Sequence, residues 1–503
     1  MKTCLTESTK ISRRSFLQAL GVLTLSGSLA ACGGTGKAKS DRLAAGSLAY
    51  TPDEVVTVEF SDGGITVSPE DAAGLAVEET ALSVSGAGVY ALSGRCADGS
   101  VKVEAQTEDV VLLLDGLTLT SADTAPIVCG ESAGVTIAVV DGTENTLTDS
   151  EANDPDNAAD NENAEKAVVK CKDGSQVVLC GGGALTVNAL GKNGIKSGTA
   201  LDDRDASLTI RELTLNIEAL VNDAINAEQR LKVESGNLTI AAGEDAIHCD
   251  MELNIGAEGT TGPAITVSTC CEGLEGAVLN IHSGNMDITS TDDCLNAANS
   301  DLGDYAFEIN ISGGTIKAYS SGGDGFDSNG TLTITGGDIS VWTASTADNQ
   351  PLDADGRITI SGGTVLAAGG SAGMGFSISA SQPYVTFGGG RDSSLSLTGG
   401  EAFSIADESG KSVLDSTALC DAAFLFYSSP ALTAEGRYTV QSTVTATAKT
   451  GEADTQFGGN GGPGGSGGQR PDGMTPPDGQ MPQGQPPQSD GTTPPELPAA
   501  SSN

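Results

Sequence analysis

The sequence predicts an all-β protein, a single-stranded right-handed parallel β-helix (a solenoid), with a disordered N-terminal tether and a disordered Gly/Pro-rich C-terminal tail. Three observations predict it: aromatic residues are only 4% of the chain, 68 of the 503 residues are glycine, and a short apolar motif returns about every 26 residues. Val, Ile, Thr, Leu and Ser dominate the apolar runs, which favours short strands. Self-similarity at such a period is typical of solenoids.

The recurring motif is an apolar anchor residue that follows Gly, Ala or a polar turn. The seven anchors are Ile195, Ile225, Ile247, Leu274, Leu295, Phe326 and Leu352. The second residue after each anchor (position +2) is small, as in Ser197 and Ala227. Because side chains alternate along a strand, the anchor and the small residue should point inward, and positions +1 and +3 outward.

Two further strands complete each predicted repeat. One reads like residues 332–334 (LTI), and a Gly-rich bend then leads to a second strand such as residues 338–341. Three short strands in about 26 residues match one turn of a parallel β-helix. The usual chirality of crossover connections favours the right-handed coil.

The N-terminus reads as a twin-arginine-type lipoprotein signal peptide over residues 1–31, with Arg13 and Arg14 as its arginine pair. The apolar stretch that follows is too short and too rich in Gly and Ser for a stable membrane span. Its end, LAAC at residues 29–32, resembles a bacterial lipobox with Cys32 as the lipidated first residue. The alternative is an ordinary signal peptide with a chance cysteine.

These signals define the expected organisation. Residues 32–50 form a lipidated tether, residues 51–450 form the β-helix, and residues 451–503 form a Gly/Pro/Gln-rich tail that buries too little apolar surface to become ordered. The protein is expected as a monomer on the extracellular face of a bacterial cell membrane, held there by the lipid at Cys32 alone. Export permits disulfides, but most of the cysteines read as small buried apolar residues.

The net charge of −42 limits the possible partners. It excludes nucleic acid, whose phosphates need a basic face, and it disfavours an anionic lipid surface. Many of the acids fall two residues before an anchor (position −2) or at positions +1 and +3. Stacked turns would place such carboxylates about 4.8 Å apart, so either their pKa values rise or a cation lies between them.

Calcium is the expected cation, because it takes six to eight oxygen ligands and two stacked turns can supply them. The alternative is a solvated acidic face that only confers solubility. On this reasoning the candidate ligands are Asp223, Asp245, Asp250, Asp292 and Asp293.

Several segments resemble one known family, the carbohydrate-binding β-helix lipoproteins of bacterial cell surfaces. They are VYALSGRCADGSVKVEA (89–105), VVLLLDGLTLTSADTAPIVC (110–129), DGTENTLTD (141–149), GDGFDSNGTLTITGGDISVW (323–342), LDADGRITISGGTVLAAG (352–369) and the closing FLFYSSPALTAEGRYTV (424–440). The resemblance covers about residues 51–445. It implies a pectate-lyase-like β-helix, calcium bound by rung aspartates, and binding of acidic pectin-like or cellulosic polysaccharides.

The resemblance also implies particular ligands. The matches at GDGFDSN and LDADG carry the calcium inference onto Asp324, Asp327, Asp353 and Asp355. Calcium bound by these residues could bridge to the carboxylates of a uronate polymer, which the bare acidic body would repel. Other turns depart from the family pattern, with Lys196 in place of an acid and Gln350-Pro351 before the last anchor.

Enzyme activity is uncertain, and binding is the favoured function. A calcium-dependent polysaccharide lyase would need a basic side chain beside the ion, and Lys196, Lys317 and Arg357 are the outward candidates. The sequence has only two histidines and no nucleophilic triad, so we predict no catalytic residue. A third alternative is a non-catalytic adhesin or structural surface protein.

Overall fold

The computed structural model describes residues 43–156, 158–302, 305–344, 349–370, 377–389, 395–441 and 444–454. The predicted signal peptide, Arg13, Arg14, Cys32 and the predicted tail beyond Asp454 therefore lie outside the described residues. The chain divides into two units, residues 1–457 and 458–503, and all that follows concerns the first. None of its described helices is long and apolar enough to cross a membrane.

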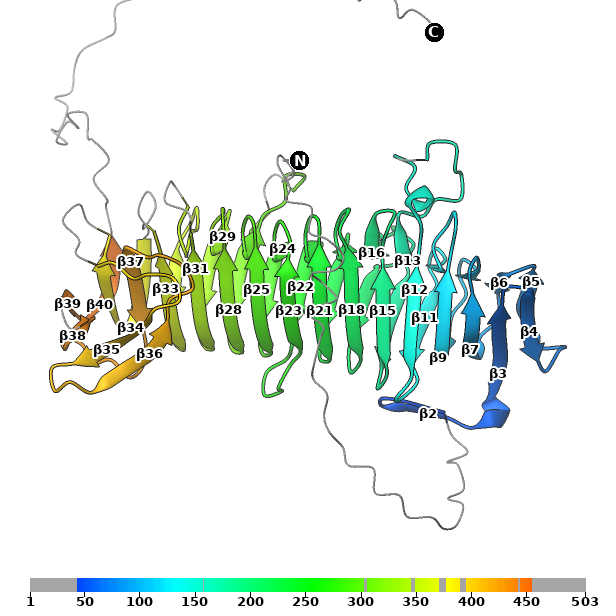
Figure 1. The fold of residues 1–503 in the computed structure, drawn as a ribbon, viewed down its shortest axis with the longest axis horizontal. Helices are drawn as coiled ribbons and strands as arrows, with labels where there is room; N and C mark the ends of the chain where they lie inside the picture. The colour runs from blue at the N-terminus through cyan, green and yellow to red at the C-terminus, as the bar shows by residue number, and fades with distance from the viewer. Residues whose placement is uncertain are drawn as a thin grey trace, which may run out of the picture. The chain divides into compact units, whose positions relative to one another are not determined.

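The described chain is all-β, with only two short 3-10 helices, η1 (Pro52–Glu54) and η2 (Glu151–Asn153). Most strands belong to one large sheet in which a strand pairs in parallel with its counterparts in the turns before and after it. Figure 1 shows these strands side by side, from β3 in blue to β34 in orange. The pairings follow three parallel stacks, called here the anchor stack, the second stack and the third stack.

The anchor stack contains the predicted anchors. Its members are β6 (Ala81–Val84), β8 (Ser100–Val103), β10 (Ile127–Cys129), β13 (Ala167–Cys171), β16 (Asn193–Ser197), β19 (Ile225–Ala227), the first parts of β22 (Ile247–Ile255) and β24 (Leu274–Ile281), β26 (Leu295–Ala297) and β29 (Phe326–Ser328).

The second stack contains the LTI-like strands. Its members are β3 (Val55–Ser61), the first parts of β7 (Gly88–Cys96) and β9 (Val110–Thr120), β11 (Gly134–Val139), β14 (Gln176–Gly181), β17 (Ser207–Ile210), β20 (Arg230–Val233), the last parts of β22 and β24, β27 (Glu308–Ile311), β30 (Thr331–Ile334), β32 (Ile358–Ile360) and β34 (Ser377–Gly388).

The third stack follows the Gly-rich bends. Its members are the last parts of β7 and β9, β12 (Glu144–Thr148), β15 (Ala184–Asn188), β18 (Thr214–Ala219), β21 (Asn237–Ala242), β23 (Ala264–Thr269), β25 (Asn285–Ser290), β28 (Thr315–Ser320), β31 (Asp338–Thr343) and β33 (Thr364–Gly369).

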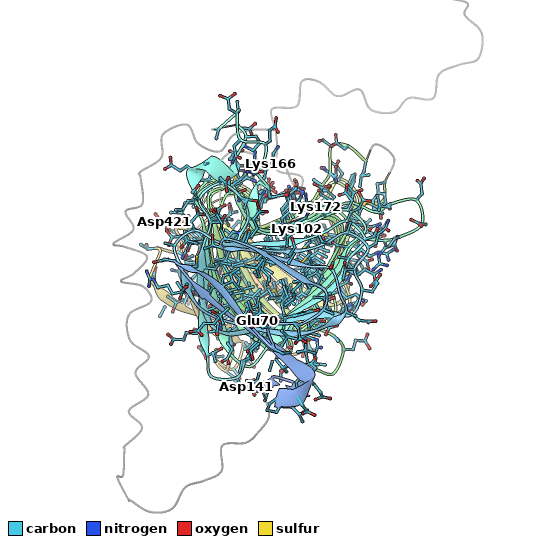
Figure 2. The ribbon with its side chains drawn as sticks, turned by 90° about the vertical axis from the view of Figure 1, so that its right-hand side faces the viewer. Glu70, Lys102, Asp141, Lys166, Lys172 and Asp421 are labelled. Carbon is cyan, nitrogen blue, oxygen red and sulfur yellow. The ribbon has the colours of Figure 1, made fainter. Side chains whose placement is uncertain are left out.

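The register aligns the anchors as the sequence predicted. Ile195 pairs with Ile225, and the alignment continues through the other anchors to Phe326, which forms a single bridge to Leu352. These side chains are at most 3% exposed and belong to one continuous core. In the end-on view of Figure 2 side chains fill the interior. Each buried anchor contributes about 1.5–3 kcal/mol of transfer free energy.

The two ends of the large sheet depart from parallel pairing. At the N-terminal end β4 (Gly64–Ser68) pairs antiparallel with β3, and β5 (Leu75–Glu78) with β6. At the C-terminal end β37 (Phe424–Ser428) pairs antiparallel with both β33 and β34, and β40 (Lys449–Asp454) with β34. These strands cover edges that would otherwise present unpaired backbone groups. Because β40 ends at Asp454, the sheet extends four residues into the segment that the sequence assigned to the tail.

A small antiparallel sheet accompanies the C-terminal end. It contains β35 (Ala402–Asp407), β36 (Ser412–Thr417), β38 (Arg437–Val440) and β39 (Val444–Thr447), and shares a second hydrophobic cluster with Trp342 and Tyr427. The sequence placed one uniform coil over residues 51–450. In the structure the parallel pairing ends at β34, because the strands after it pair antiparallel and cover the edge of the sheet.

Residues 43–50, which the sequence assigned to the tether, form β1 (Leu43–Ala45) and β2 (Leu48–Tyr50). Ala45 is fully buried in a cluster with Val140 and Cys180. The Gly46 N–H donates to Asp141 Oδ1 at 2.7 Å. This hairpin therefore packs against the strand stacks rather than extending from them, beside Asp141 at the lower edge of Figure 2.

Candidate metal centre

The +1 positions of the anchor stack form one row of side chains in register. In chain order the row reads Lys102, Val128, Lys170, Lys196, Asn226, His248, Glu275, Asn296 and Asp327. Asp353 follows in the next turn, after the bridge from Phe326 to Leu352. The side chains of the row thus change from mainly basic to mainly acidic along the chain. The spacing of these residues in the sequence indicates the change, whereas the overall composition does not.

The −2 positions form a second row of side chains, and the carboxylates of this row accept hydrogen bonds from backbone N–H groups. The Asp245 N–H donates to Asp223 Oδ1 at 3.2 Å, and the Glu272 N–H to Asp245 Oδ1 at 3.3 Å. The Asp324 N–H donates to Asp293 Oδ1 at 2.6 Å, and the Gln350 N–H donates to Asp324. Each of these carboxylates therefore has one oxygen fixed by the next turn.

Three predicted calcium ligands, one from the −2 row and two from the +1 row, lie close together. Asp324, Asp327 and Asp353 each offer a carboxylate oxygen, and these oxygens all lie within 4.8 Å of one another. Burial first, and then the neighbouring carboxylates, raise the pKa of Asp324 to about 7 and that of Asp327 to about 6. The pKa of Asp353 is raised by the same causes. The site is electrostatically strained unless it holds a proton or a cation.

Asp292, Asp293 and Asp355 surround this trio. Burial, followed by the charges of Asp292 and Asp324 among others, raises the pKa of Asp293 to about 8. A Cβ on Gly323 would lie 2.3 Å from Asp292 Oδ1 and 2.5 Å from Asp293 Oδ1, so both carboxylates approach at a glycine that has no side chain to exclude them. The charge of Asp355 contributes to the raised pKa of Asp327. We call these six residues the C-terminal acidic cluster.

Two buried amide oxygens beside the cluster have no hydrogen-bond partner among the described residues. They are Gln350 Oε1 and Asn296 Oδ1, in residues that are 3% and 8% exposed. The Gln350 side chain hydrogen-bonds Asp353, so its free oxygen lies close to the trio. Buried polar atoms are normally satisfied, and amide oxygens are common calcium ligands. The donor set of carboxylates and amide oxygens fits calcium.

The other predicted ligands form a different arrangement around His248. Its Nδ1 lies 3.0 Å from Asp245 Oδ2 and 2.6 Å from Glu275 Oε2, while its Nε2 lies 2.8 Å from Asp250 Oδ1. Asp245 and Asp250 therefore contact opposite sides of one imidazole ring and do not face a common oxygen-lined site. We call Asp245, His248, Asp250 and Glu275 the histidine cluster.

Electrostatics reinforce the contacts of the histidine cluster. Burial acts to lower the pKa of His248, but hydrogen bonds to its three carboxylates outweigh burial and raise that pKa well above its usual range. Burial is the largest cause that raises the pKa of Asp245 to about 6. Burial and the neighbouring acids raise the pKa of Glu272 to about 9. The environment thus favours positive charge at the Nδ1 side of the ring.

Asp223 takes part in neither group of ligand atoms. Its Oδ1 accepts the Asp245 N–H and its Oδ2 accepts Asn226 Nδ2 at 2.7 Å, so both oxygens have hydrogen-bond partners. Sequence reasoning missed His248 and Glu275 as candidate ligands. Glu275 directly follows the anchor Leu274, and this +1 position is the signal that could have identified it.

The candidate lyase bases lie apart from one another. Lys196 forms an ion pair with Glu228 at 2.7 Å, and Lys317 forms one with Asp287 at 3.1 Å in the third stack. Arg357 directly precedes β32 and lies two residues after Asp355. The sequence offers four aromatic rings that could stack on sugars. Trp342 and Tyr384 are buried, Tyr319 is half-buried and Tyr305 is 40% exposed.

Comparisons with known proteins show which family the chain resembles. A family described as carbohydrate-binding domain-containing protein matches residues 78–373 and 260–406. A carbohydrate-binding domain-containing protein of Acetivibrio thermocellus is 29% identical over 202 residues, which are 40% of this chain and 66% of that relative, slightly less than two thirds of its length.

One solved structure is also similar. It is a gadolinium derivative of a polysaccharide lyase-like protein from C. thermocellum, with 23% identity and a TM-score of 0.33, and the match covers 60% of this chain and 95% of that one. The family match spans more than half of the sequence. The chain therefore belongs to the family of carbohydrate-binding domain-containing proteins.

Proposed function

We propose that this protein is a cell-surface lipoprotein that binds polysaccharide through a calcium-dependent, right-handed parallel β-helix. The polysaccharide is an acidic pectin-like polymer or a cellulosic glucan. The observation that carries the proposal is the convergence of Asp324, Asp327 and Asp353 beside an unpaired buried amide oxygen, in a chain of a carbohydrate-binding family.

The strand pairing supports the β-helix. Strands three apart in the chain pair in parallel over many successive turns, for example β13 with β16 and β16 with β19. Parallel strands need crossover connections, and here the strands of the other two stacks provide them. The general preference for right-handed crossovers supports the hand of the coil.

Calcium would be held by the C-terminal acidic cluster. Asp324, Asp327 and Asp353 would supply carboxylate oxygens and Gln350 an amide oxygen, while Asp292, Asp293 and Asp355 add charge. An ion at this place neutralises carboxylates whose pKa values are raised by burial and mutual repulsion. Its remaining coordination positions are available to water or to a sugar oxygen.

The bound ion accounts for recognition of an acidic polymer. A chain with a net charge of −42 repels a polyuronate, and calcium reverses the local field. Lys102, Lys170 and Lys196 continue the +1 row at its basic end. A polymer lying along the row would therefore meet ammonium groups at one end and calcium at the other.

The N-terminal signals support the cellular location. Arg13 and Arg14 fit twin-arginine export, and Cys32 in its lipobox fits a lipid anchor on the extracellular face of a bacterial membrane. The folded part would act as a monomer. Mass spectrometry of the mature protein, with lipid found or not found on Cys32, tests the anchor.

Pull-down onto insoluble pectin and cellulose, with calcium and with chelator, tests the binding function. We expect retention in calcium, loss of pectin binding in chelator, and loss in an Asp327→Asn/Asp353→Asn variant. An Asp338→Asn variant, changed at an exposed acid of the third stack, serves as the control. Retention of neither polymer by the wild-type protein would contradict the proposal and favour an adhesin or structural role.

A calcium-dependent polysaccharide lyase is the second candidate function. Burial and the neighbouring Lys196 lower the pKa of Lys170, a property that suits a general base. However, Lys170 lies three turns from His248, about 14 Å at about 4.8 Å a turn, and further from the C-terminal acidic cluster. Unsaturated uronate products after incubation with polygalacturonate would establish the lyase, and their absence would support binding alone.

A further inference from the structure

The histidine cluster differs in chemistry from the C-terminal acidic cluster, because its central atom is an imidazole nitrogen. Asp245 Oδ2, His248 Nδ1 and Glu275 Oε2 all lie within 4.8 Å of one another. Their side chains are 12%, 23% and 18% exposed. The three atoms therefore converge in a largely buried position that solvent still reaches.

A single proton on Nδ1 does not satisfy this arrangement. One N–H makes one well-aligned hydrogen bond, yet two carboxylate oxygens lie 3.0 Å and 2.6 Å from Nδ1. With Asp250, three carboxylates surround one imidazole, so even the protonated ring leaves two negative charges uncompensated. A doubly charged ion between Nδ1 and the two oxygens would take the place of the Nδ1 proton and leave one negative charge instead of two.

The opposite side of the ring is arranged as in a metal-bound histidine. Nε2 lies 2.8 Å from Asp250 Oδ1. A ligating histidine usually donates its second N–H to a carboxylate, which fixes the tautomer and orients the ring. Here that contact would keep a proton on Nε2 when a metal ion replaces the proton on Nδ1, so that the Nδ1 lone pair faces the ion between Asp245 and Glu275. Asp250 is itself held in place, since Asn299 Nδ2 donates to its backbone oxygen at 3.1 Å.

The register explains why the cluster occurs at this turn. His248 and Glu275 are neighbours in the +1 row, and Asp245 is the −2 residue of the same turn as His248. Asn226 precedes His248 in the row, and its side chain donates to Asp223 rather than toward the ring. The only other histidine of the sequence, His282, lies elsewhere and contacts Ser312 Oγ at 2.9 Å.

We propose that Asp245, His248 and Glu275 form a binding site for a divalent transition-metal ion of the zinc class, with Asp250 positioning His248 as an outer-shell partner. Imidazole suits zinc, copper, nickel and iron, whereas calcium takes oxygen ligands. Two oxygens and one nitrogen leave a fourth position of a tetrahedral zinc site for water or a sugar oxygen. The site is separate from the calcium ligands of the proposed function and does not depend on them.

Nuclear magnetic resonance of the histidine nitrogens tests the site in the unaltered protein. The chain has two histidines, so the assignment needs only the His282→Gln variant. On adding one equivalent of Zn²⁺ in excess Ca²⁺, we expect the His248 Nδ1 resonance to shift while Nε2 keeps its proton, with His282 unchanged. No shift at His248, or the same shift with Ca²⁺ alone, would overturn the proposal.

Titration with Co²⁺, followed by its visible absorption, tests the individual ligands. We expect His248→Gln to abolish high-affinity binding and Asp250→Asn to weaken it about 10–100-fold, the usual effect of losing an outer-shell partner. His282→Gln should bind as the wild type does. Wild-type affinity in folded His248→Gln protein would overturn the proposal. Asp327→Asn should leave Co²⁺ binding intact, so failure of this site and failure of the calcium site are distinguishable.

Discussion

The backbone N–H of Asp324 donates a 2.6 Å hydrogen bond to the carboxylate of Asp293, thirty-one residues earlier and one turn away. Glu272 stands in the same relation to Asp245. The −2 carboxylates are therefore part of the connection between turns, and only one oxygen of each is fixed by it. The same acids that join the turns contribute charge to the cation site.

Replacing Asp293 tests this double role. Asp293→Ala removes the acceptor of the Asp324 N–H and should lower the free energy of unfolding by about 1–3 kcal/mol, with or without calcium. Asp293→Asn keeps a carbonyl acceptor, and above about pH 8, where the Asp293 carboxyl is ionised, it also removes a repelling charge, so in calcium-free buffer at that pH it should be as stable as the wild type or more so. Chemical denaturation of both variants checks this. Equal losses in the two variants would argue against the hydrogen bond as the cause.

Removing a carboxylate of the trio should matter mainly in calcium. At a calcium concentration 100 times its Kd, one bound ion stabilises the folded state by about 2.7 kcal/mol. Asp327→Asn should lose most of this gain but should not be destabilised in chelator, because it relieves repulsion from Asp353 and Asp355. Thermal unfolding in calcium and in chelator checks this, with Asp338→Asn as the control. A loss of equal size in both conditions would contradict metal ligation.

The raised carboxyl pKa values predict the pH dependence of the calcium-free protein. Asp324 and Asp293 have pKa values of about 7 and about 8 in the folded state, against about 3.9 in an unfolded chain. Between these values the folded state binds more protons than the unfolded state, so the free energy of unfolding falls as pH rises from about 4 to about 8. Calcium should reduce this fall. Thermal unfolding across this range checks it, and stability that rises with pH would contradict the account.

Gln350 offers a gain-of-affinity test. If its unpaired Oε1 faces the cation, Gln350→Glu adds a charged ligand of the same shape. Calcium affinity should increase and calcium-free stability should decrease, because another buried carboxylate joins Asp324 and Asp353. Calorimetric calcium titration and thermal unfolding measure the two effects. Unchanged affinity with lower stability would place the oxygen outside the site.

The repeat was predictable from sequence because the anchors obey a strict pattern. An inward apolar residue followed two positions later by a small one recurs at the seven predicted anchors, so Ile225, Leu274 and Phe326 align with one another by pattern alone. The closing strands were not predictable in this way. β37 and β40 have no periodic partner in the sequence, and their antiparallel pairing follows from the need to cover an edge.

The sites were only partly predictable for a related reason. The GDGFDSN and LDADG segments indicated Asp324, Asp327, Asp353 and Asp355 as a group, and the structure brings ligand atoms of the first three together. The sequence also placed Asp245 and Asp250 among the candidate oxygen ligands. That interpretation did not include the ring of His248, which occupies the +1 position between them, as a ligand. Counting acids by row cannot reveal such an intervening side chain, whereas the register of His248 with Glu275 does.

Calcium titration of metal-free protein by calorimetry tests the central claim most directly. The account predicts saturable binding by the wild-type protein that is lost in Asp327→Asn/Asp353→Asn and kept in His248→Gln and Asp338→Asn. Binding heats for the double variant that match those of the wild type would contradict it, as would the absence of calcium binding by the wild-type protein.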